Sequence, residues 1–542
     1  MTWRPVLSLA AGLALALAFP NYNVPLLGWI SVGALIVASL GAGLAEAAVC
    51  GFAYGAAFYT FSIPWIYTVM HQYGPLPVWQ AAGVMALLVV QQSLIFIFFS
   101  VPLAWIARHN CNRALLAAPF LWVAAELLRS RLGALSFPWD LLGYLALGNL
   151  ALAQLASLAG VYGLSFVVAG YNALLVWFVS ARFRSAKRRR PGPLSNRPVA
   201  APVAAWLGAT VTLFALALFG GRLVPRAQPT HVAHLVQTDL PTVAEYPANW
   251  DAIHSGDMAQ LDSISIGAGG KQPGLIIWPE VPAPFSLQQA AFAQRAAHIA
   301  HDSQSDFLLG VIDWKPAAQP APGATAPGAR TEVRQLPYNS AALLDPAGRE
   351  EFLYDKMHLV PFSEYVPGRD FFWFAKDLTA LAGDFQQGRR YAVGDLPGGR
   401  FSVFICYEAV FPDEVRRFVR AGAGLLINIS NDGWLGRSSG PAQSLLMARM
   451  RAIENRRCLL RDANNGFTAS IDPYGRIAAS LPVDVRGELD APYGFRGDLT
   501  PYTRWGDWFA WLCVAIAACF LLGTIDKLSK SSTNRRNRAS SQ

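Results

Sequence analysis

The sequence predicts a bundle of about eight membrane-spanning helices joined to a mixed α/β domain. Composition is the first indication: 53% of the 542 residues are apolar and only 15% are charged, whereas soluble domains carry about 25% charged residues. The second is that long apolar runs fill both ends of the chain, while the middle holds short ones. We therefore expect a membrane domain of seven spans over 1–225, an α/β domain over 226–495, and an eighth span with a basic tail over 496–542.

The individual spans are predicted from apolar runs of about 20 residues, the length that crosses a bilayer as a helix. They begin near Val6, Leu26, Ala47, Trp79, Leu115, Leu152, Pro202 and Trp508. The runs near Leu115 and Trp508 are the weakest predictions, since each is short of the ideal length. The first run resembles a signal peptide, but further apolar runs follow at once, so we interpret it as a membrane helix.

The net charge of +9 is unevenly distributed. Residues 231–490 carry 23 basic and 29 acidic side chains, which leaves a balance of +15 for the rest of the chain. This excess is concentrated in two segments beside apolar runs, 182–197 and 527–538, so it argues against a nucleic-acid-binding face on a folded domain. Because Lys and Arg favour cytoplasmic loops, we expect both basic segments and both termini in the cytoplasm, and the acidic region on the opposite face.

The acidic region is predicted to be a layered α/β domain. Short apolar runs bounded by turn residues predict buried strands at 231–236, 274–278, 307–312, 401–405 and 424–429. Helix-like stretches such as 287–301 and 444–457 alternate with them. Residues 315–330 are rich in Pro, Ala and Gly, which predicts a surface loop.

Three side chains at predicted strand ends or in apolar surroundings suit catalysis. Glu280 directly follows a strand, Lys356 lies among aromatic and apolar residues, and Cys406 ends a strand before a turn into a helix. A desolvated Lys can stabilise an oxyanion. A helix N-terminus or a cation would lower the pKa of the Cys406 thiol, and the backbone N–H of Tyr407 could bind an oxyanion. Taken singly, each has an ordinary alternative: a solvated loop Glu, a surface ion pair and a buried structural Cys.

In this chain order Glu280, Lys356 and Cys406 match the Glu–Lys–Cys triad of the nitrilase-like carbon–nitrogen hydrolase superfamily, and Glu364 matches its accessory Glu. Within that superfamily the chain is most similar to the apolipoprotein N-acyltransferase family. Further segments carry the resemblance over nearly the whole chain: 137–139, 338–341, 430–436, 447–452 and 464–466. The resemblance implies a nitrilase-like αββα sandwich between the seventh and eighth spans, on the periplasmic face of a bacterial inner membrane.

The resemblance also implies a ping-pong acyl transfer that serves lipoprotein maturation. Glu280 would take the proton of Cys406, and the thiolate would attack an acyl ester of a membrane phospholipid. The oxyanion would lie near Lys356 and the N–H of Tyr407, with Glu408 as a further accessory residue. The resulting thioester would acylate the N-terminal α-amine of the diacylglyceryl-cysteine of an apolipoprotein. No cofactor and no metal are implied, and nothing in the sequence demands a partner subunit, so we expect a monomer.

Substrate-binding residues are less defined by the resemblance. The family has a functionally important Trp after a Gln-Gly-Asn-Ile-Pro-like motif, whose counterpart here is 237–241. Trp250 comes later than the family pattern, so either Trp250 fills this role or Tyr246 replaces it. The lipid-facing mouth has two candidates, the loop around Trp434 and the aromatic run 371–374.

Two other functions would fit parts of the sequence. A membrane-tethered amidase would use the same triad with water as acceptor, but eight spans are excessive for a tether. A transporter would need ionisable groups within its spans, and only Glu126 and Asp140 lie in or near one.

A metal site is not expected from the histidines. His298 and His301 have helical spacing but no evident third ligand, and His231 and His234 would lie on opposite faces of a strand. A cluster of four arginines is predicted to be a solvated helix face: Arg449, Arg451, Arg456 and Arg457.

Overall fold

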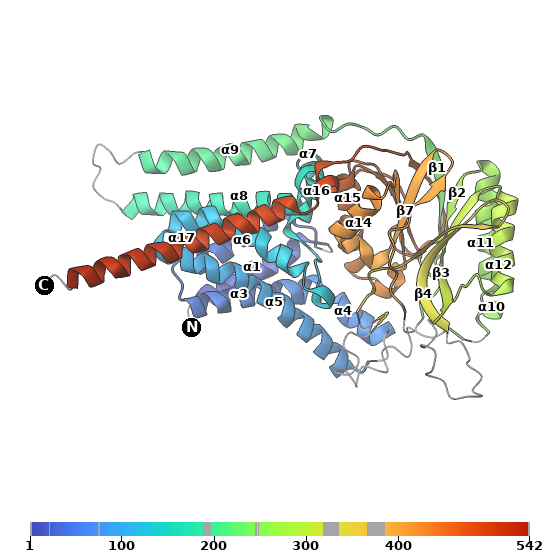
Figure 1. The fold of residues 1–542 in the computed structure, drawn as a ribbon, viewed down its shortest axis with the longest axis horizontal. Coiled ribbons are helices and arrows are strands. Elements are labelled where there is room, and N and C mark those ends of the chain that lie inside the picture. The colour runs from blue at the N-terminus through green and yellow to red at the C-terminus, as the bar shows by residue number, and fades with distance from the viewer. Residues whose placement is uncertain are drawn as a thin grey trace, which may run out of the picture. The chain divides into compact units, whose positions relative to one another are not determined.

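The computed structural model describes residues 3–539 except 21, 74–75, 188–196, 244–245, 248, 318–334, 362 and 366–384. The aromatic run 371–374 and most of the predicted loop after Lys315 lie outside the described residues. The chain forms two compact units (Figure 1). The first comprises Met1–Pro64, Ala82–Pro225 and Thr500–Gln542, and the second Trp65–Ala81 and Arg226–Leu499.

Apolar helices build the first unit. Among the described residues, six are long and apolar enough to cross a membrane: α3 (Leu44–Ser62), α5 (Val78–His109), α6 (Cys111–Arg129), α8 (Ala156–Lys187), α9 (Arg197–Phe219) and α17 (Trp508–Ala539). Two shorter apolar helices precede them, α1 (Trp3–Ala18) and α2 (Gly28–Ser39). Apolar helices therefore lie at or near all eight predicted positions. The two weakest predicted runs, near Leu115 and Trp508, form α6 and α17, which are among the six, whereas α1 and α2 are the shorter apolar helices.

Buried hydrogen bonds join helices within the first unit. The backbone N–H of Gly33 in α2 donates to Oδ1 of Asn172 in α8 at 2.7 Å, and Asn172 is fully buried. Small residues allow this close approach of two helices, as is usual where lipid removes the hydrophobic drive for helix association. Short helices complete the unit: α7 (Leu150–Ala153) and α16 (Pro501–Trp505).

Two six-stranded sheets form the centre of the second unit. In spatial order the first contains β12 (Gly487–Tyr493), β1 (His231–Gln237), β2 (Leu275–Ile277), β3 (Asp306–Pro316), β4 (Gln335–Leu344) and β5 (Glu350–Asp355). The second contains β11 (Ile477–Ser480), β10 (Ala469–Ile471), β9 (Cys458–Ala463), β8 (Leu425–Ser430), β7 (Gly399–Ile405) and β6 (Gly394–Leu396). All five predicted strands are confirmed.

Alternating side chains pack the sheets against each other and against helices. Leu275 and Ile277 of β2 belong to the core that the two sheets share, whereas Ile276 joins a second core with helix residues. The helices over the first sheet are α10 (Trp250–Ile253), α11 (Ser255–Lys271) and α12 (Ala290–Ser303), and those over the second are α14 (Pro412–Arg420) and α15 (Gly440–Asn455) (Figure 1). The result is an αββα sandwich.

The arginine cluster on and after α15 corrects one prediction. Arg451 is 0% exposed and Arg457 is 1% exposed, so they do not form a solvated face. Arg451 pairs with Glu454 at 2.8 Å, and Nε of Arg457 donates to the carbonyl of Ala423 at 2.8 Å. Buried guanidinium groups require such partners. The first pair lies within α15, and the second bond joins the chain just after α15 to the chain just before β8.

Candidate active site

Glu280 lies just beyond the carboxyl end of β2. The backbone N–H of Trp278 donates to the carbonyl of Leu308 at 2.8 Å, which continues the pairing of β2 with β3 toward the glutamate. Gly310 of β3 allows the chain to pass close by, because a Cβ there would lie 2.7 Å from the Cα of Glu280. The Glu280 side chain is buried, so it is not a solvated loop residue.

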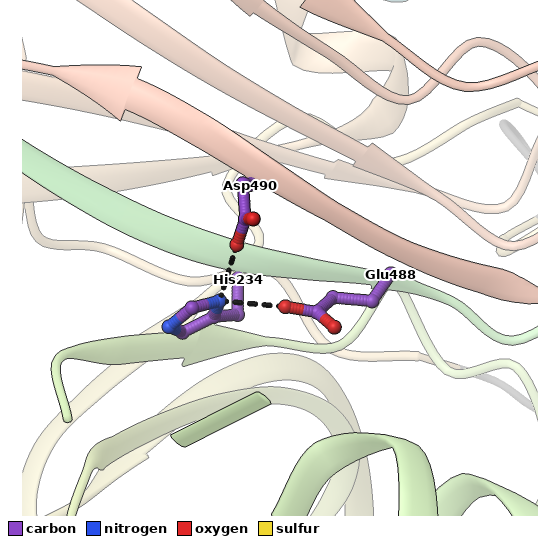
Figure 2. Close-up of side chains that lie close together, drawn as sticks. All are labelled: His234, Glu488 and Asp490. Atoms are coloured by element: carbon purple, nitrogen blue, oxygen red, sulfur yellow. Dashed lines mark hydrogen bonds and ion pairs between the residues drawn. The ribbon is translucent and has the colours of Figure 1, made fainter. Parts of the chain in front are cut away.

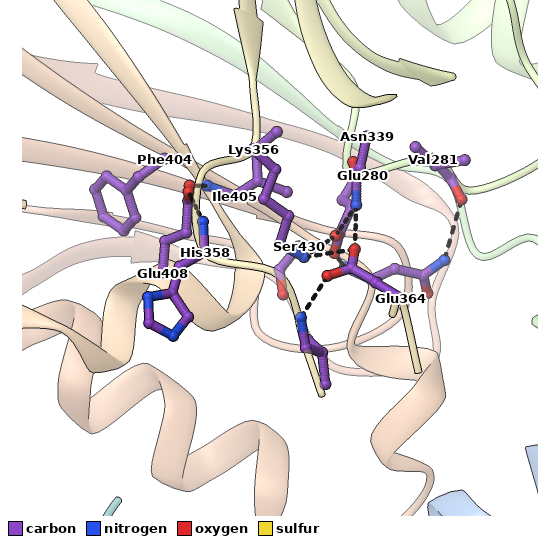
Figure 3. Close-up of polar contacts among 12 residues, drawn as sticks. Glu280, Val281, Asn339, Lys356, His358, Glu364, Phe404, Ile405, Glu408 and Ser430 are labelled. Carbon is purple, nitrogen blue, oxygen red and sulfur yellow. Dashed lines mark hydrogen bonds and ion pairs between the residues drawn. The ribbon is translucent and has the colours of Figure 1, made fainter. Parts of the chain in front are cut away.

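Lys356 follows β5 and is 1% exposed. Its Nζ lies 2.9 Å from Oε1 of Glu280 and 2.9 Å from Oε1 of Glu364 (Figure 3). One buried ammonium group therefore bridges two buried carboxylates. This geometry excludes the surface ion pair that the sequence left open for Lys356.

Two asparagines complete this network, and the sequence analysis did not single them out. Nδ2 of Asn339 in β4 donates to Oε1 of Glu280 at 2.8 Å and to Oε1 of Glu364 at 2.7 Å (Figure 3). The backbone N–H of Asn431, just after β8, donates to Oε2 of Glu280 at 2.9 Å. Both belong to segments that carry the family resemblance, which was the only available signal.

These contacts set the charges of the network. Burial raises the pKa of Glu280, but Lys356 and the amide donors outweigh burial and hold that pKa below its ordinary value. Burial lowers the pKa of Lys356, but Glu280 and Glu364 raise it well above its usual range. The resting site therefore holds an ionised Glu280 and a protonated Lys356.

Cys406 begins a short 3₁₀ helix, Cys406–Val410, directly after β7. Its φ of +50° lies in the left-handed region, which costs energy for a residue with a Cβ and is frequent at functional sites. Burial raises the pKa of the Cys406 thiol, the charge of Glu280 adds to this rise, and Lys356 opposes it without compensating. The prediction of a lowered thiol pKa is therefore wrong, and a base must remove this proton.

The two residues after Cys406 are buried. Oε1 of Glu408 accepts hydrogen bonds from the hydroxyl of Tyr354 and the N–H of Met357, both at 2.7 Å, and its Oε2 accepts from the N–H of Ile405 at 2.6 Å. Glu408 thus ties the end of β5 to the end of β7, the strands that precede Lys356 and Cys406. Tyr407 packs its ring edge-on to Phe411.

The candidate substrate-binding aromatics lie in different surroundings. Trp250 is 3% exposed in the core of α10, α11 and α12, where it packs against Phe285 and His254. Tyr246 is partly buried against the same core. Trp434 is half-buried in a short helix, Asp432–Leu435 (η8), that follows Asn431. Of the three, Trp434 is the one joined to the carboxylate network by a short stretch of chain.

A second polar cluster lies across β1 and β12 (Figure 2). Nδ1 of His234 lies 2.8 Å from Oε1 of Glu488 and 3.0 Å from Oδ1 of Asp490, and Nε2 lies 2.8 Å from the carbonyl of Gln272. One ligand atom from each of His234, Glu488 and Asp490 lies within 4.8 Å of the others, so the three could share a cation. The hydrogen bonds already account for the arrangement as a tie between β12, β1 and the end of α11.

Comparisons with known proteins match two separate parts of the chain to family models. Residues 11–174 match the family model of the apolipoprotein N-acyltransferase N-terminal domain, and residues 237–489 match that of carbon–nitrogen hydrolases. The apolipoprotein N-acyltransferase of Geobacter metallireducens is 34% identical over 95% of this chain and 94% of its own length. That of Methylococcus capsulatus is 30% identical over 95% of both chains.

Solved structures of the nitrilase superfamily are also similar to about half of this chain. Saccharomyces cerevisiae Nit3 has 18% sequence identity and a TM-score of 0.34, covering 48% of this chain and 89% of its own. An amidase from Nesterenkonia has 20% identity and a TM-score of 0.36, covering 52% of this chain and 95% of its own.

Proposed function

Because this chain belongs to the apolipoprotein N-acyltransferase family, we propose that its buried Glu280, Lys356 and Cys406 transfer an acyl chain from a membrane phospholipid to an apolipoprotein. The chain is an acyltransferase of lipoprotein maturation. The observation that carries it is the single ammonium of Lys356 held at 2.9 Å from both Glu280 and Glu364. This arrangement keeps Glu280 ionised beside a thiol that needs a base.

The first half-reaction acylates Cys406. Oε1 of Glu280 already accepts two hydrogen bonds, from Lys356 and Asn339, so we assign proton transfer to Oε2, which accepts one from Asn431. Glu280 takes the thiol proton, and the thiolate forms a bond to the ester carbonyl carbon. The oxyanion is stabilised by the ammonium of Lys356 and the N–H of Tyr407. The C–O bond then breaks, Glu280 returns the proton to the lysophospholipid, and a thioester remains.

The second half-reaction forms the amide. The neutral α-amine of the diacylglyceryl-cysteine attacks the thioester, and Glu280 takes a proton from the nitrogen as the C–S bond breaks. The Cys406 thiolate then regains that proton from Glu280, which restores the resting site. Dividing one slow aminolysis into two acyl transfers is the general advantage of a cysteine nucleophile.

We assign the protein to the bacterial inner membrane as a multi-pass, monomeric enzyme with a periplasmic catalytic unit and cytoplasmic termini. The basic segments 182–197 and 527–538 support this orientation. We also propose three parts of the chain: a membrane domain over 1–225, a catalytic domain over 226–495 and a last span over 496–542. Glu364, Tyr407 and Glu408 act as accessory residues, and Trp434 is the preferred contact for substrate over Trp250.

The test is a search for the thioester. The full-length protein is incubated with phosphatidylethanolamine carrying a labelled acyl chain, and a hydroxylamine-sensitive adduct is measured. We expect the adduct on the wild type and on Cys111→Ala, whose thiol is also unpaired but exposed, and none on Cys406→Ala. If all three folded proteins stay unlabelled, the phospholipid-donor mechanism is wrong and hydrolysis of an amide by water becomes the better explanation.

A further inference from the structure

Between α3 and α5 the chain forms a short segment, here called the brace, which consists of α4 (Trp65–Thr68) and a π-helical stretch (Val69–Tyr73). The helices on either side are apolar and long enough to cross a membrane, yet the brace groups with the catalytic unit. π-helical turns are rare and occur frequently at functional sites. The catalytic unit thus includes a piece of chain that arrives from the membrane-spanning part of the sequence.

The brace makes two specific contacts with the segment that follows β8. Trp65 is 5% exposed, and its Nε1 donates to Oε1 of Gln443 at 3.1 Å, in the first turn of α15. The ring of Tyr73 packs edge-on to Trp434 of η8, with the centroids 5.7 Å apart and the planes at 75°. The brace therefore contacts η8 and also the helix that comes after it.

Gly436, which ends η8, shows how closely the chain follows the brace. Its φ is +58°, a conformation that favours glycine. A Cβ at this position would lie 3.6 Å from the hydroxyl of Tyr73 and 4.0 Å from the methyl of Thr68. The other end of η8 is fixed within the sandwich, because Arg461 binds both carboxylate oxygens of Asp432 at 2.8 and 2.9 Å. The turn is thus held by the core at one end and by the brace at the other.

The fixed end of η8 leads directly into the reacting groups. Asn431, one residue earlier, donates its N–H to Oε2 of Glu280, the oxygen assigned above to proton transfer. Ser430 donates to Oδ1 of Asp432 at 2.8 Å and also hydrogen-bonds the thiol of Cys406. A displacement of η8 would therefore shift hydrogen-bond partners of both the base and the nucleophile.

We propose that Trp65 and Tyr73 are positioning residues for acyl transfer, which hold η8 and through it keep Asn431 and Ser430 in register with Glu280 and Cys406. The inference rests on the proposed function, because it assigns those two residues to the chemistry. Neither brace residue touches the reacting atoms, so each acts through η8 or α15. The brace makes the geometry of the site depend on a segment tethered between two apolar helices.

The experiment measures single-turnover thioester formation by the full-length protein at saturating labelled phosphatidylethanolamine. Tyr73→Ala removes the aromatic edge, and we expect its rate constant to fall roughly tenfold, in line with the worth of such ring pairs. Tyr73→Phe keeps the ring and should react within about twofold of wild type. Because Trp434 is also the proposed substrate contact, apparent phospholipid affinity is measured separately, and the rate constant at saturating phospholipid reports on the positions of Asn431 and Ser430.

The hydrogen bond from Trp65 has its own test. Trp65→Phe and Gln443→Met each remove one partner, and we expect each to slow thioester formation by roughly three- to tenfold. The double variant should be no slower than the worse single variant, because both lose the same bond. Trp79→Ala is the matched control, since Trp79 lies in the first turn of α5, a few residues after the brace, and is 73% exposed. It should keep the wild-type rate.

The outcomes separate this inference from the proposed function. A wild type that forms no thioester removes the proposed function itself. A wild type that forms it while Tyr73→Ala and Trp65→Phe match its rate overturns the positioning role alone. Rates that fall only in proportion to the folded fraction, measured by thermal unfolding, also overturn it, because the brace would then contribute stability without aligning the site.

Discussion

Two buried charged clusters, one in each unit, differ in how their charges are satisfied. In the catalytic unit Lys356 lies 2.9 Å from each of two carboxylates. In the membrane unit Arg129 is 3% exposed and lies over the ring of Tyr59 at 5.6 Å, and its Nε has no hydrogen-bond partner among the described residues. The two clusters hold similar side chains, but only the first pairs its cation.

The carboxylates of the membrane unit bind neighbouring groups of the chain rather than the cation. Oε1 of Glu126 accepts from Nε1 of Trp122 at 3.0 Å and from the N–H of Leu142 at 2.8 Å. Asp140 accepts a hydrogen bond from Ser62 at the end of α3. Together with Arg129, these acids line a cavity whose walls are otherwise apolar. In the catalytic unit the ion pairs of Lys356 fix two carboxylates in place. In the membrane unit the carboxylates of Glu126 and Asp140 instead hold neighbouring chain segments by hydrogen bonds.

Removing the cation from the catalytic cluster should have the largest effect. Lys356→Met leaves Glu280 and Glu364 facing each other in a buried site, so we expect a loss of about 3–5 kcal/mol in the free energy of unfolding and no measurable thioester. Chemical denaturation and the labelled-lipid assay measure the two effects. Lys271→Met is the control, because Lys271 also pairs with a glutamate but its side chain is 69% exposed. Equal losses from both variants would contradict the special role of Lys356.

Neutralising one carboxylate in each unit should affect different quantities: the rate of thioester formation for Glu280 and the stability of the fold for Glu126. Glu280→Gln keeps the shape and most hydrogen bonds but removes the base, so thioester formation should slow by about 10²–10⁴-fold. Glu126→Gln should keep the rate within about tenfold and act mainly on stability. A single-turnover assay with thermal unfolding distinguishes them. A Glu280→Gln protein that reacts at the wild-type rate would exclude Glu280 as the base.

Removing the guanidinium of Arg129 should change the free energy of unfolding only slightly. Arg129→Met deletes a buried guanidinium that forms no ion pair with any described residue and replaces it with an apolar side chain of similar length. Because burying an uncompensated charge is unfavourable, we expect the free energy of unfolding to change by less than about 1 kcal/mol or to rise. Thermal unfolding in detergent measures it. A loss as large as that of Lys356→Met would show that the two clusters are satisfied to the same degree.

The smallest effect concerns pH. Because the pKa of Glu280 is lowered, its ionised form stabilises the fold above its unfolded value of about 4.3, and this contribution is lost only as the pH falls through the folded pKa. The pKa of Lys356 is raised, so its contribution persists up to and beyond about 10.4. Thioester formation should therefore stay level between roughly pH 5 and 9. A drop centred near neutral pH would contradict an ionised Glu280.

Much of the fold was predictable because its signals are local. The five predicted strands and the spans rest on runs of apolar residues, which burial in a core or in lipid requires. β9 was missed because it carries Arg461 and Asp462, which are fully buried. The partner that allows Arg461 to be buried, Asp432, lies 29 positions away, so no local pattern reveals it.

The site was predictable as a set of residues but not as a set of charges. Glu280, Lys356 and Cys406 were singled out from strand ends and from the family resemblance, and their catalytic roles stay a prediction. The direction of the Cys406 pKa was not, because it depends on the balance between burial and the distance to Lys356. Asn339 was not singled out either, since its role requires β4 to lie between the two carboxylates.

The proposed nucleophile and its proposed base come from different sheets of the sandwich. Glu280 and Lys356 follow strands of one sheet, and Cys406 follows a strand of the other. Glu280 and Lys356 precede Cys406 in the chain by 126 and 50 positions, so only the packing of one sheet against the other brings them beside the thiol. A chain in which the sheets have not packed together therefore carries this cysteine without its proposed base.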